Sequence, residues 1–426
     1  MSTVPSPSGP RGAAWKWSVC GLLLLASAIN YMDRQTLSGL SVRITQEFGM
    51  SKTQYGQVEA VFGYAFAAGS VLFGWMADRF AVHRVYAAAL ALWSLAGMAT
   101  GWARDHQDLL VLRGLLGFFE AGHWPCAVRI TRSLLDERQR SLGNGLLQSG
   151  ATVGAILTPL LLPLLLGAGA ADGTGAWRPP FYLLGGVGLL WLVPWFSMVR
   201  PGDLRSGAES MAAAGAAAVP FTRVLFSGRM LAVIVVVACI NTTWQVLRAW
   251  LPMFLQKGRG YTETEALHFN SAFFAAADVG CLAAGAMAVA LARRGRTPSG
   301  ARFAVFAGCA LLCCGTLAAP WLGRGPLLLT VLLAIAAGSL GVFPLYHTFT
   351  QDLSDHHQGK ITGAAGVAGW ILPAQAQMLF GMSADRLGTM DPGLAVAGLL
   401  PLVALPALWY LHRIRIRTPS PIPPTP

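Results

Sequence analysis

The chain has 426 residues, of which 54% are hydrophobic and only 12% are charged, and its formal net charge is +12. Because a soluble domain carries about 25% charged residues, this composition excludes an ordinary soluble domain and indicates a helical membrane protein. The positive charge does not indicate nucleic-acid binding, because no basic run with interleaved aromatic residues stands outside the apolar segments. The seven cysteines all fall in apolar segments, which predicts packing residues and neither disulfides nor a zinc site.

Twelve apolar segments follow one another along the chain. A helix that crosses a bilayer takes about 20 mostly apolar residues. The first segment has no convincing cleavage site, so we expect it to be retained as a span. We therefore predict an all-α membrane protein with twelve transmembrane helices, at 15–38, 54–77, 83–103, 107–132, 140–168, 178–199, 229–255, 265–292, 302–322, 326–351, 360–384 and 393–412.

The longest polar or low-complexity connection, "RPGDLRSGAESMAAAGAAAVPFTR", lies between the sixth and seventh segments. It predicts an N-terminal six-helix bundle at 1–199, a cytoplasmic linker at 200–228 and a C-terminal six-helix bundle at 229–426. The loops on the side that holds both termini carry more than twice as many Lys and Arg residues as the loops on the other side. Cytoplasmic loops are enriched in these residues, so we predict that both termini are cytoplasmic.

The two halves of the chain resemble each other in sequence. The segment "RSLGNGLLQSGATVGAILTPLL" opens the fifth predicted span and "GKITGAAGVAGWILPAQAQML" opens the eleventh, with glycines at similar intervals before a proline. Paired halves of this kind are typical of secondary transporters, which work by alternating access.

The second span ends in "GWMADRFAVHR", which is similar to the loop 2–3 motif of the major facilitator superfamily. Within that superfamily, five stretches resemble the anion:cation symporter family, which includes bacterial hexuronate and other sugar-acid transporters and animal vesicular glutamate and sialic-acid carriers. They are "INYMDRQTLS", "RGLLGFFEAGHWPCAVRIT", "ERQRSLGNGLLQSGATVGAILTPLL", "WQVLRAWLPMFLQ" and "FPLYHTFTQDLS". The resemblance implies the major facilitator fold of two pseudo-symmetric bundles. We interpret Asp78, Arg79 and Arg84 of the loop motif as a gate at the cytoplasmic face, with positive-inside anchoring as the alternative.

Arg34 closes the first apolar run, where an ionisable residue is costly and indicates function. Its guanidinium presents a planar fork that fits a carboxylate, and the resemblance implies that it binds the carboxylate of the substrate. The alternative is an arginine that reaches the lipid headgroups. Tyr31 shares a helix face with Arg34 and, by the resemblance, lines the substrate cavity; the alternative is a tyrosine of the interfacial belt.

Asp33 is the expected proton site, because a buried carboxylate gains a proton readily unless it is paired. Substrate bound to Arg34 would favour protonation of Asp33, and the alternative is a static ion pair between these neighbours. Arg113 and Glu120 lie about two turns apart in the fourth span, so each faces the same way and can engage the first span. The resemblance implies a coupling network in which Glu120 is a second proton acceptor and Arg113 changes partners. Structural ion pairs are the alternative.

Weaker polar stripes mark the fifth and seventh spans: Asn144, Gln148 and Thr152, then Asn241, Gln245 and Arg248. Each makes one polar helix face, which fits either a cavity lining or hydrogen bonds between helices. Arg248 and Asp278 are candidates for an ion pair, and His123 shares a face with Glu120, but their roles stay open. From these stripes and further polar residues we predict that substrate is lined by Tyr64, Gln148, Asn241, Gln245 and Trp370, with Tyr346, Gln375 and Gln377 as weaker candidates.

We therefore predict a proton-coupled symporter of an organic anion, which the resemblance implies is a hexuronate or related sugar acid, carried into the cytoplasm across a bacterial inner membrane. We expect a monomer surrounded by lipid, with no catalytic residue, metal or cofactor and no nucleic-acid partner. The proton is the expected coupling ion, and sodium is the alternative. Other mono- or dicarboxylates, efflux, or a membrane sensor are the remaining alternatives. An enzyme would need a nucleophile–base pair or a metal cluster, and the sequence indicates neither.

Overall fold

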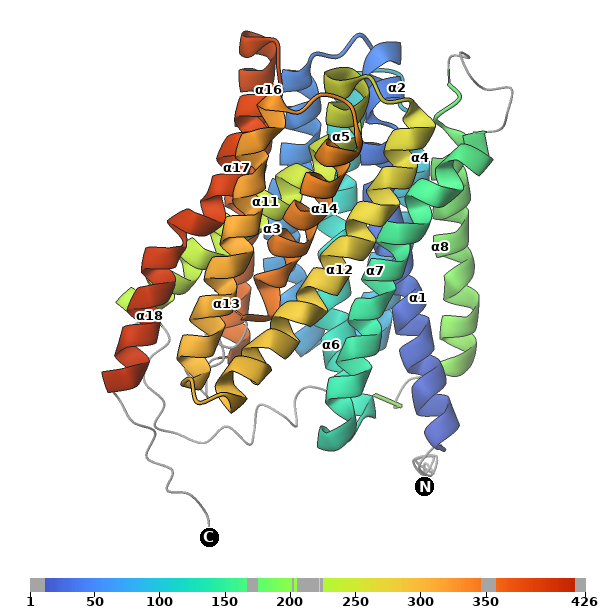
Figure 1. Ribbon diagram of the computed structural model, residues 1–426. Helices are drawn as coiled ribbons and strands as arrows, with labels where there is room; N and C mark the ends of the chain where they lie inside the picture. The colour runs from blue at the N-terminus through green and yellow to red at the C-terminus, as the bar shows by residue number, and fades with distance from the viewer. Residues whose placement is uncertain are drawn as a thin grey trace, which may run out of the picture. The chain divides into compact units, whose positions relative to one another are not determined.

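The computed structural model describes residues 12–166, 175–200, 203–204, 222, 225–345 and 358–417. In these ranges the regular structure is helical (Figure 1), and nine helices are long and apolar enough to cross a membrane. Described helices fall on all twelve predicted spans. Most of the predicted linker 200–228 and the end of the tenth span, 346–351, lie outside the described residues.

Two compact units make up the chain. The first takes in Met1–Gly49 and Val61–Ala216, and the second takes in Met50–Ala60 and Ala217–Pro426. The change of unit at Ala216 falls inside the predicted linker. The assignment of Met50–Ala60 differs from the expected bundle 1–199, because the start of the second span packs on helices of the second unit.

In the described residues, the first six predicted spans form seven helices, together with a short helix that was not predicted. The span expected at 107–132 is two helices, because Pro125 lacks the N–H that would bond to the carbonyl of residue 121. The two helices meet at Ala121 and Gly122. A Cβ on Gly122 would lie 2.9 Å from Ala89 Cβ, so glycine permits the close packing there. The helices are α1 (Ala13–Gly39), α2 (Ser41–Glu47), α3 (Lys52–Arg79), α4 (Val82–Thr100), α5 (His106–Glu120), α6 (His123–Leu134), α7 (Glu137–Leu166) and α8 (Pro179–Met198).

Helix α7 packs closely on α1 through small residues. A Cβ added to Gly150 would collide with the carbonyl oxygen of Leu24, and one added to Gly154 would collide with that of Ala28. Small residues at helix interfaces in membranes let two backbones approach closely. This contact fixes the position of α1, which carries Asp33 and Arg34.

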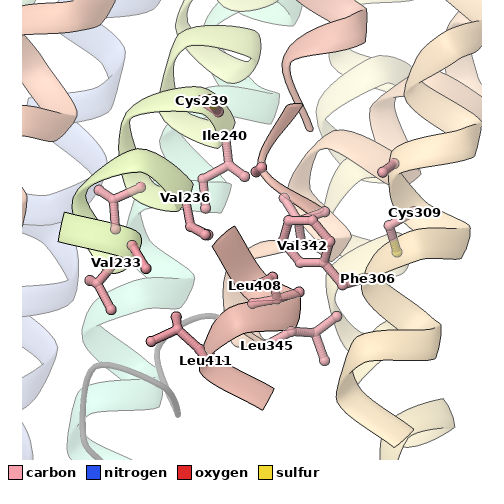
Figure 2. Packing of buried hydrophobic residues seen from close by; sticks show 14 of the residues in the cluster. Val233, Val236, Cys239, Ile240, Phe306, Cys309, Val342, Leu345, Leu408 and Leu411 are labelled. Atoms are coloured by element: carbon pink, nitrogen blue, oxygen red, sulfur yellow. The ribbon is translucent and has the colours of Figure 1, made fainter. Parts of the chain in front are cut away.

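The second unit contains the remaining spans and the first turns of α3. Its core is a buried apolar cluster in which Val236 and Ile240 lie near Phe306, Val342 and Leu408 (Figure 2). This core holds the helix that carries Gln245 and Arg248. The elements are α11 (Gly228–Met253), η1 (Phe254–Gly258), α12 (Glu263–Arg293), α13 (Pro298–Cys313), η2 (Cys314–Trp321), α14 (Pro326–Gly341), α16 (Gln358–Leu387), α17 (Asp391–Val403) and α18 (Leu405–Arg417).

Glycines also allow the start of α3 to contact α16. A Cβ on Gly56 would lie 2.5 Å from the carbonyl oxygen of Gln377, and one on Gly381 would collide with the carbonyl oxygen of Lys52. Glycine is therefore required on both sides of this contact. This close contact with α16 explains why the first turns of α3 belong to the second unit.

Candidate functional site

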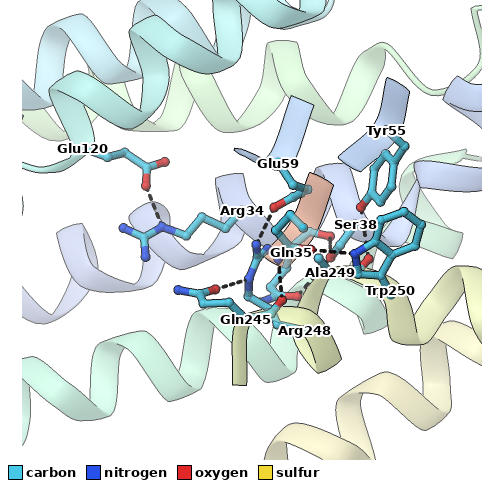
Figure 3. Close-up of polar contacts among 11 residues, drawn as sticks. Arg34, Gln35, Ser38, Tyr55, Glu59, Glu120, Gln245, Arg248, Ala249 and Trp250 are labelled. Carbon is cyan, nitrogen blue, oxygen red and sulfur yellow. Dashed lines mark hydrogen bonds and ion pairs between the residues drawn. The ribbon is translucent and has the colours of Figure 1, made fainter. Parts of the chain in front are cut away.

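Arg34 is a buried cation near the end of α1, with 3% of its surface exposed. Its Nε donates to Glu120 Oε2 at 2.6 Å (Figure 3). Its Nη2 donates to Asn30 Oδ1, one turn earlier on α1, at 2.9 Å. An arginine that anchored α1 at the lipid headgroups would be exposed, so the structure contradicts that alternative.

Aromatic rings surround the guanidinium of Arg34. Its central carbon lies 5.1, 5.4 and 5.0 Å from the ring centroids of Tyr31, Phe62 and Phe66. The guanidinium of Arg113 lies 4.7 Å from the centroid of Phe62, so both arginines contact this ring. Cation–π contacts of this kind attract more strongly when they are desolvated. The site therefore combines two buried cations with an aromatic wall that includes Tyr31.

Glu120 is the last residue of α5 and is fully buried. Its spacing from Arg113 predicted a partner on the first span, and the ion pair with Arg34 confirms that prediction. Removing one partner of a buried ion pair typically costs about 3–5 kcal/mol, because the other charge is left uncompensated. Glu120 is thus the carboxylate that balances Arg34 inside the first unit.

Asp33 lies beside Arg34 in the sequence but faces a different helix. A Cβ on Gly97 of α4 would lie 3.3 Å from Asp33 Oδ1. Asp33 is 2% exposed, and neither carboxylate oxygen has a hydrogen-bond partner within the described part of the chain. The described residues therefore do not show the static Asp33–Arg34 ion pair that was the alternative. A buried polar group without a partner in a native structure calls for a functional explanation.

His123 is buried between two hydroxyl groups. Its Nε2 lies 2.9 Å from Ser27 Oγ of α1 and its Nδ1 lies 3.0 Å from the Tyr86 hydroxyl of α4. The ring also makes an edge contact with Trp93. The sequence left the role of His123 open. In the structure His123 has a packing role, because its two ring nitrogens contact hydroxyl groups on two neighbouring helices.

A second buried ion pair lies in the second unit. Arg248 Nη2 donates to Glu59 Oε2 at 2.5 Å and Arg248 Nε donates to Gln245 Oε1 at 2.7 Å (Figure 3). The sequence predictions missed Glu59, although an acidic residue inside the apolar run "QVEAVFGYAF" is the same kind of signal that singled out Glu120. Asp278, the partner that the sequence suggested for Arg248, is only half-buried.

The other predicted lining residues are more scattered. The hydroxyl of Tyr64 is buried with no hydrogen-bond partner among the described residues. Gln148 is exposed, and Trp370 is half-buried on α16. Asn241 Nδ2 donates to the carbonyl of Val237 on its own helix at 2.9 Å. Further candidates have these positions: Asn144 accepts from Thr131, Gln377 is buried, Gln375 is exposed and Tyr346 lies outside the described residues.

Asp78, in the loop motif after the second span, has an ion-pair partner that the sequence analysis did not predict. Asp78 forms an ion pair with Arg129 of α6. Arg79 lies over the ring of Trp75, 5.9 Å from its centroid, and Arg84 is exposed. Asp78, one of the three residues predicted to form a gate, thus links α3 to α6.

Comparisons with known proteins agree with this architecture. The model of the Major Facilitator Superfamily matches residues 23–377. A probable sulfoacetate transporter of Cupriavidus necator is 30% identical over 94% of this chain and 95% of its own length. The D-galactonate transporter of Escherichia coli is 27% identical over 83% and 86% of the two chains. The hexuronate transporter of Escherichia coli K12 is 23% identical over 63% and 64%.

Solved structures show the same fold. A bacterial homologue of the human lysosomal transporter Spinster, in an inward-facing and unoccupied conformation, matches with a TM-score of 0.79 and 16% identity, over 97% of this chain and all of its own. A D-xylose–proton symporter matches with a TM-score of 0.71 and 15% identity, over 92% and 97%. The described helices fit the twelve-helix fold of these proteins. The chain therefore belongs to the Major Facilitator Superfamily and is a multi-pass membrane transporter, not an enzyme.

Proposed function

We propose that this transporter is a proton-coupled symporter that carries a sugar acid, such as a hexuronate or an aldonate, into the cytoplasm by alternating access. The observation that carries the proposal is the buried Arg34, bonded to the carboxylate of Glu120 and lying beside Asp33. The names of the relatives support the substrate class, since one is a D-galactonate transporter and another a hexuronate transporter.

Exchange of the anion on Arg34 is the proposed coupling step. A guanidinium binds one carboxylate well in a forked geometry, so a substrate carboxylate competes with Glu120 for it. A proton on Glu120 removes its negative charge and leaves Arg34 to the substrate. Asp33 lies in a buried place without hydrogen-bond partners in the described residues, where a carboxyl group is least costly in its neutral form. One proton on either acid would offset the charge of the arriving anion.

The setting of the transporter is part of the proposal. We place it in a bacterial inner membrane with both termini cytoplasmic, on the basis of the loop charges, and as a monomer surrounded by lipid. Tyr31, Tyr64, Gln148, Asn241, Gln245 and Trp370 are proposed to line the substrate, and Arg113 to support the change of partners. No metal or other cofactor is needed, because the proton serves as the coupling ion.

Uptake by purified protein in liposomes tests the proposal. Labelled glucuronate, galacturonate and galactonate are offered with and without an inward proton gradient, and we expect accumulation that needs the gradient. Arg34→Gln should abolish substrate binding. Arg104→Gln is the matched control, because the side chain of Arg104 is 88% exposed. Unchanged binding in Arg34→Gln would contradict the carboxylate role, and accumulation driven by sodium alone would replace the proton.

A second substrate class is favoured by the sulfoacetate relative, which is 30% identical to the chain over nearly its whole length. Sulfoacetate is a small anion with a carboxylate and a sulfonate, and both groups suit an arginine fork. Adding unlabelled sulfoacetate to the same liposomes distinguishes the two classes. If it inhibits uptake at lower concentration than galactonate, the small sulfonated acid is the better substrate.

A further inference from the structure

The ion pair of Glu59 and Arg248 is not explained by the proposed function. Both side chains are almost completely buried, at 1% and 3% exposure. They come from helices far apart in the sequence, α3 and α11. An amide network continues from them, because Gln377 Nε2 donates to the carbonyl of Gln245 at 2.9 Å and Trp250 Nε1 donates to Gln377 Oε1 at 2.6 Å.

This pair is built like the pair of Arg34 and Glu120. In each, one guanidinium nitrogen donates to a carboxylate and another donates to an amide oxygen on the same helix, which is Asn30 for Arg34 and Gln245 for Arg248. The two arginine helices also share an Ile-Asn step, at Ile29–Asn30 and at Ile240–Asn241. Aligning these steps places Gln245 at the position of Arg34. The two units thus hold buried pairs of the same kind, with Arg248 about one turn beyond the position that corresponds to Arg34.

Glu59 lies on the turns of α3 that pack on α11 and α16. The Tyr55 hydroxyl donates to the carbonyl of Ala249 at 3.0 Å. At the start of the helix, the amide and the hydroxyl of Thr53 donate to Asp385 at 2.7 and 2.6 Å. The charged groups against these turns include Arg248 of α11 and Asp385 of α16, with Lys52 on α3 itself.

Of these contacts, the ion pair is the buried one whose strength changes with a single proton, whereas the bonds to the Asp385 carboxylate lie at the exposed start of the helix. Neutral hydrogen bonds and close glycine contacts do not depend on pH in the range where a carboxyl group titrates. Drawing a charged Glu59 away from a charged Arg248 separates two opposite charges in a buried place, which is strongly unfavourable. A protonated Glu59 carries no charge, so drawing it away costs less.

We propose that Glu59 is a further coupling residue of the transport cycle, whose protonation releases Arg248 and lets the first turns of α3 separate from α11 and α16. The inference rests on the proposed function, to which it adds one proton per cycle. Glu59 acts through Arg248, so it is a positioning residue and does not itself contact the substrate.

The ratio of protons to substrate tests the inference. At zero membrane potential, each coupled proton multiplies the accumulation of substrate by about tenfold per unit of pH difference. A plot of accumulation against the pH gradient therefore gives the number of protons as its slope. We expect the slope of Glu59→Gln to fall by one, which lowers accumulation by about tenfold per pH unit relative to the unmodified protein. A purely structural role for Glu59 would change the rate of uptake and leave the slope unaltered.

Two variants serve as controls. Glu59→Gln leaves Arg248 without its anion and risks poor folding, whereas the double variant Glu59→Gln with Arg248→Gln removes both charges and should show the same reduced slope. Asp385→Asn alters a carboxylate that contacts the same turns at their exposed end. Its slope should equal that of the unmodified protein. Equal slopes for all four proteins would overturn the inference while the proposed symport stands.

Hydrogen exchange gives a readout that needs no substrate. In the unmodified protein, the protection of residues 52–60, corrected for intrinsic exchange rates, should fall as the pH is lowered and Glu59 takes up its proton. In Glu59→Gln it should be low at every pH. If no sugar acid is transported, this pattern would still support the proton-sensitive pair while the proposed function fails. Protection that does not change with pH in the unmodified protein would overturn the inference.

Discussion

Asp33 and Arg34 are neighbours in the sequence, yet their side chains meet different helices. Arg34 bonds to Glu120 at the end of α5, whereas Asp33 faces Gly97 of α4. A helix places consecutive residues about 100° apart, so the two adjacent residues face two different helices. Asp33 and Arg34 can therefore change their contacts separately, as the proposed coupling requires.

Arg34→Lys tests whether the shape of the guanidinium matters as well as its charge. Lysine keeps the positive charge but has no planar fork, so it cannot hold Asn30 and a carboxylate in the same way. A lost hydrogen bond to a charged group is worth about 1.5–3 kcal/mol, and we expect substrate affinity to fall about 10- to 100-fold. Competition binding on purified protein measures this change. An affinity within threefold of the unmodified protein would mean that charge alone suffices.

The sequence identified buried charged residues of both units but not all of their partners. Arg34, Arg113 and Glu120 stood out because charges are rare in apolar runs. The spacing along one helix cannot say which side chain of another helix will be met. For that reason Glu59 and Arg129, the partners of Arg248 and Asp78, emerged only from the packed structure.

Among the elements, α7 shows how a glycine determines where a helix lies. Gly154 has the backbone of α1 directly against it, whereas Gly145, on the same helix, has open space around its α-carbon. Gly154→Val should force α1 and α7 apart and destabilise the protein by about 1–3 kcal/mol, as overpacking does. Thermal unfolding in detergent measures this, with Gly145→Val as the control for helix propensity. Equal melting temperatures for the two variants would contradict the close contact.

The start of α3 is held by Asp385, which lies just beyond the predicted span 360–384. Partial burial raises the pKa of Asp385, but hydrogen bonds from the Thr53 hydroxyl and the Thr53 and Lys52 amides outweigh it and hold this pKa below its usual value. A lowered pKa in the folded state gives stability above the unfolded value, which is lost as the pH falls through the folded value. Asp385→Asn should therefore lower the melting temperature near neutral pH, and the difference should shrink below about pH 4. A difference that stays constant with pH would exclude this linkage.

Elements with a strong apolar signal were predictable, while their interruptions were not. Each of the twelve apolar segments corresponds to a described helix, since burial in lipid demands one. The break between α5 and α6, the short helix α2 and the division of the last span into α17 and α18 depend on local packing and on single prolines or glycines. Average hydropathy does not register such positions.

At the scale of the whole molecule, family and fold followed from sequence patterns that many residues share. The repeated halves, the loop motif at Asp78 and the apolar spans all predicted the major facilitator fold, and the family match over residues 23–377 confirms it. Substrate and coupling ion depend on a few side chains, and relatives with different substrates share the same scaffold. Transport measurements therefore identify the substrate and the coupling ion.

The assignment of Met50–Ala60 to the second unit has a consequence for dividing the gene. A cut within the connection 205–221 would yield two fragments of nearly equal length, as is done in split-protein complementation. The segment Met50–Ala60, with Thr53 and Glu59, would then be on the N-terminal fragment. Its partners Asp385 and Arg248 would be on the C-terminal fragment. The C-terminal product would therefore lack Met50–Ala60 of its own unit, so the gene is not a simple tandem of two autonomous modules.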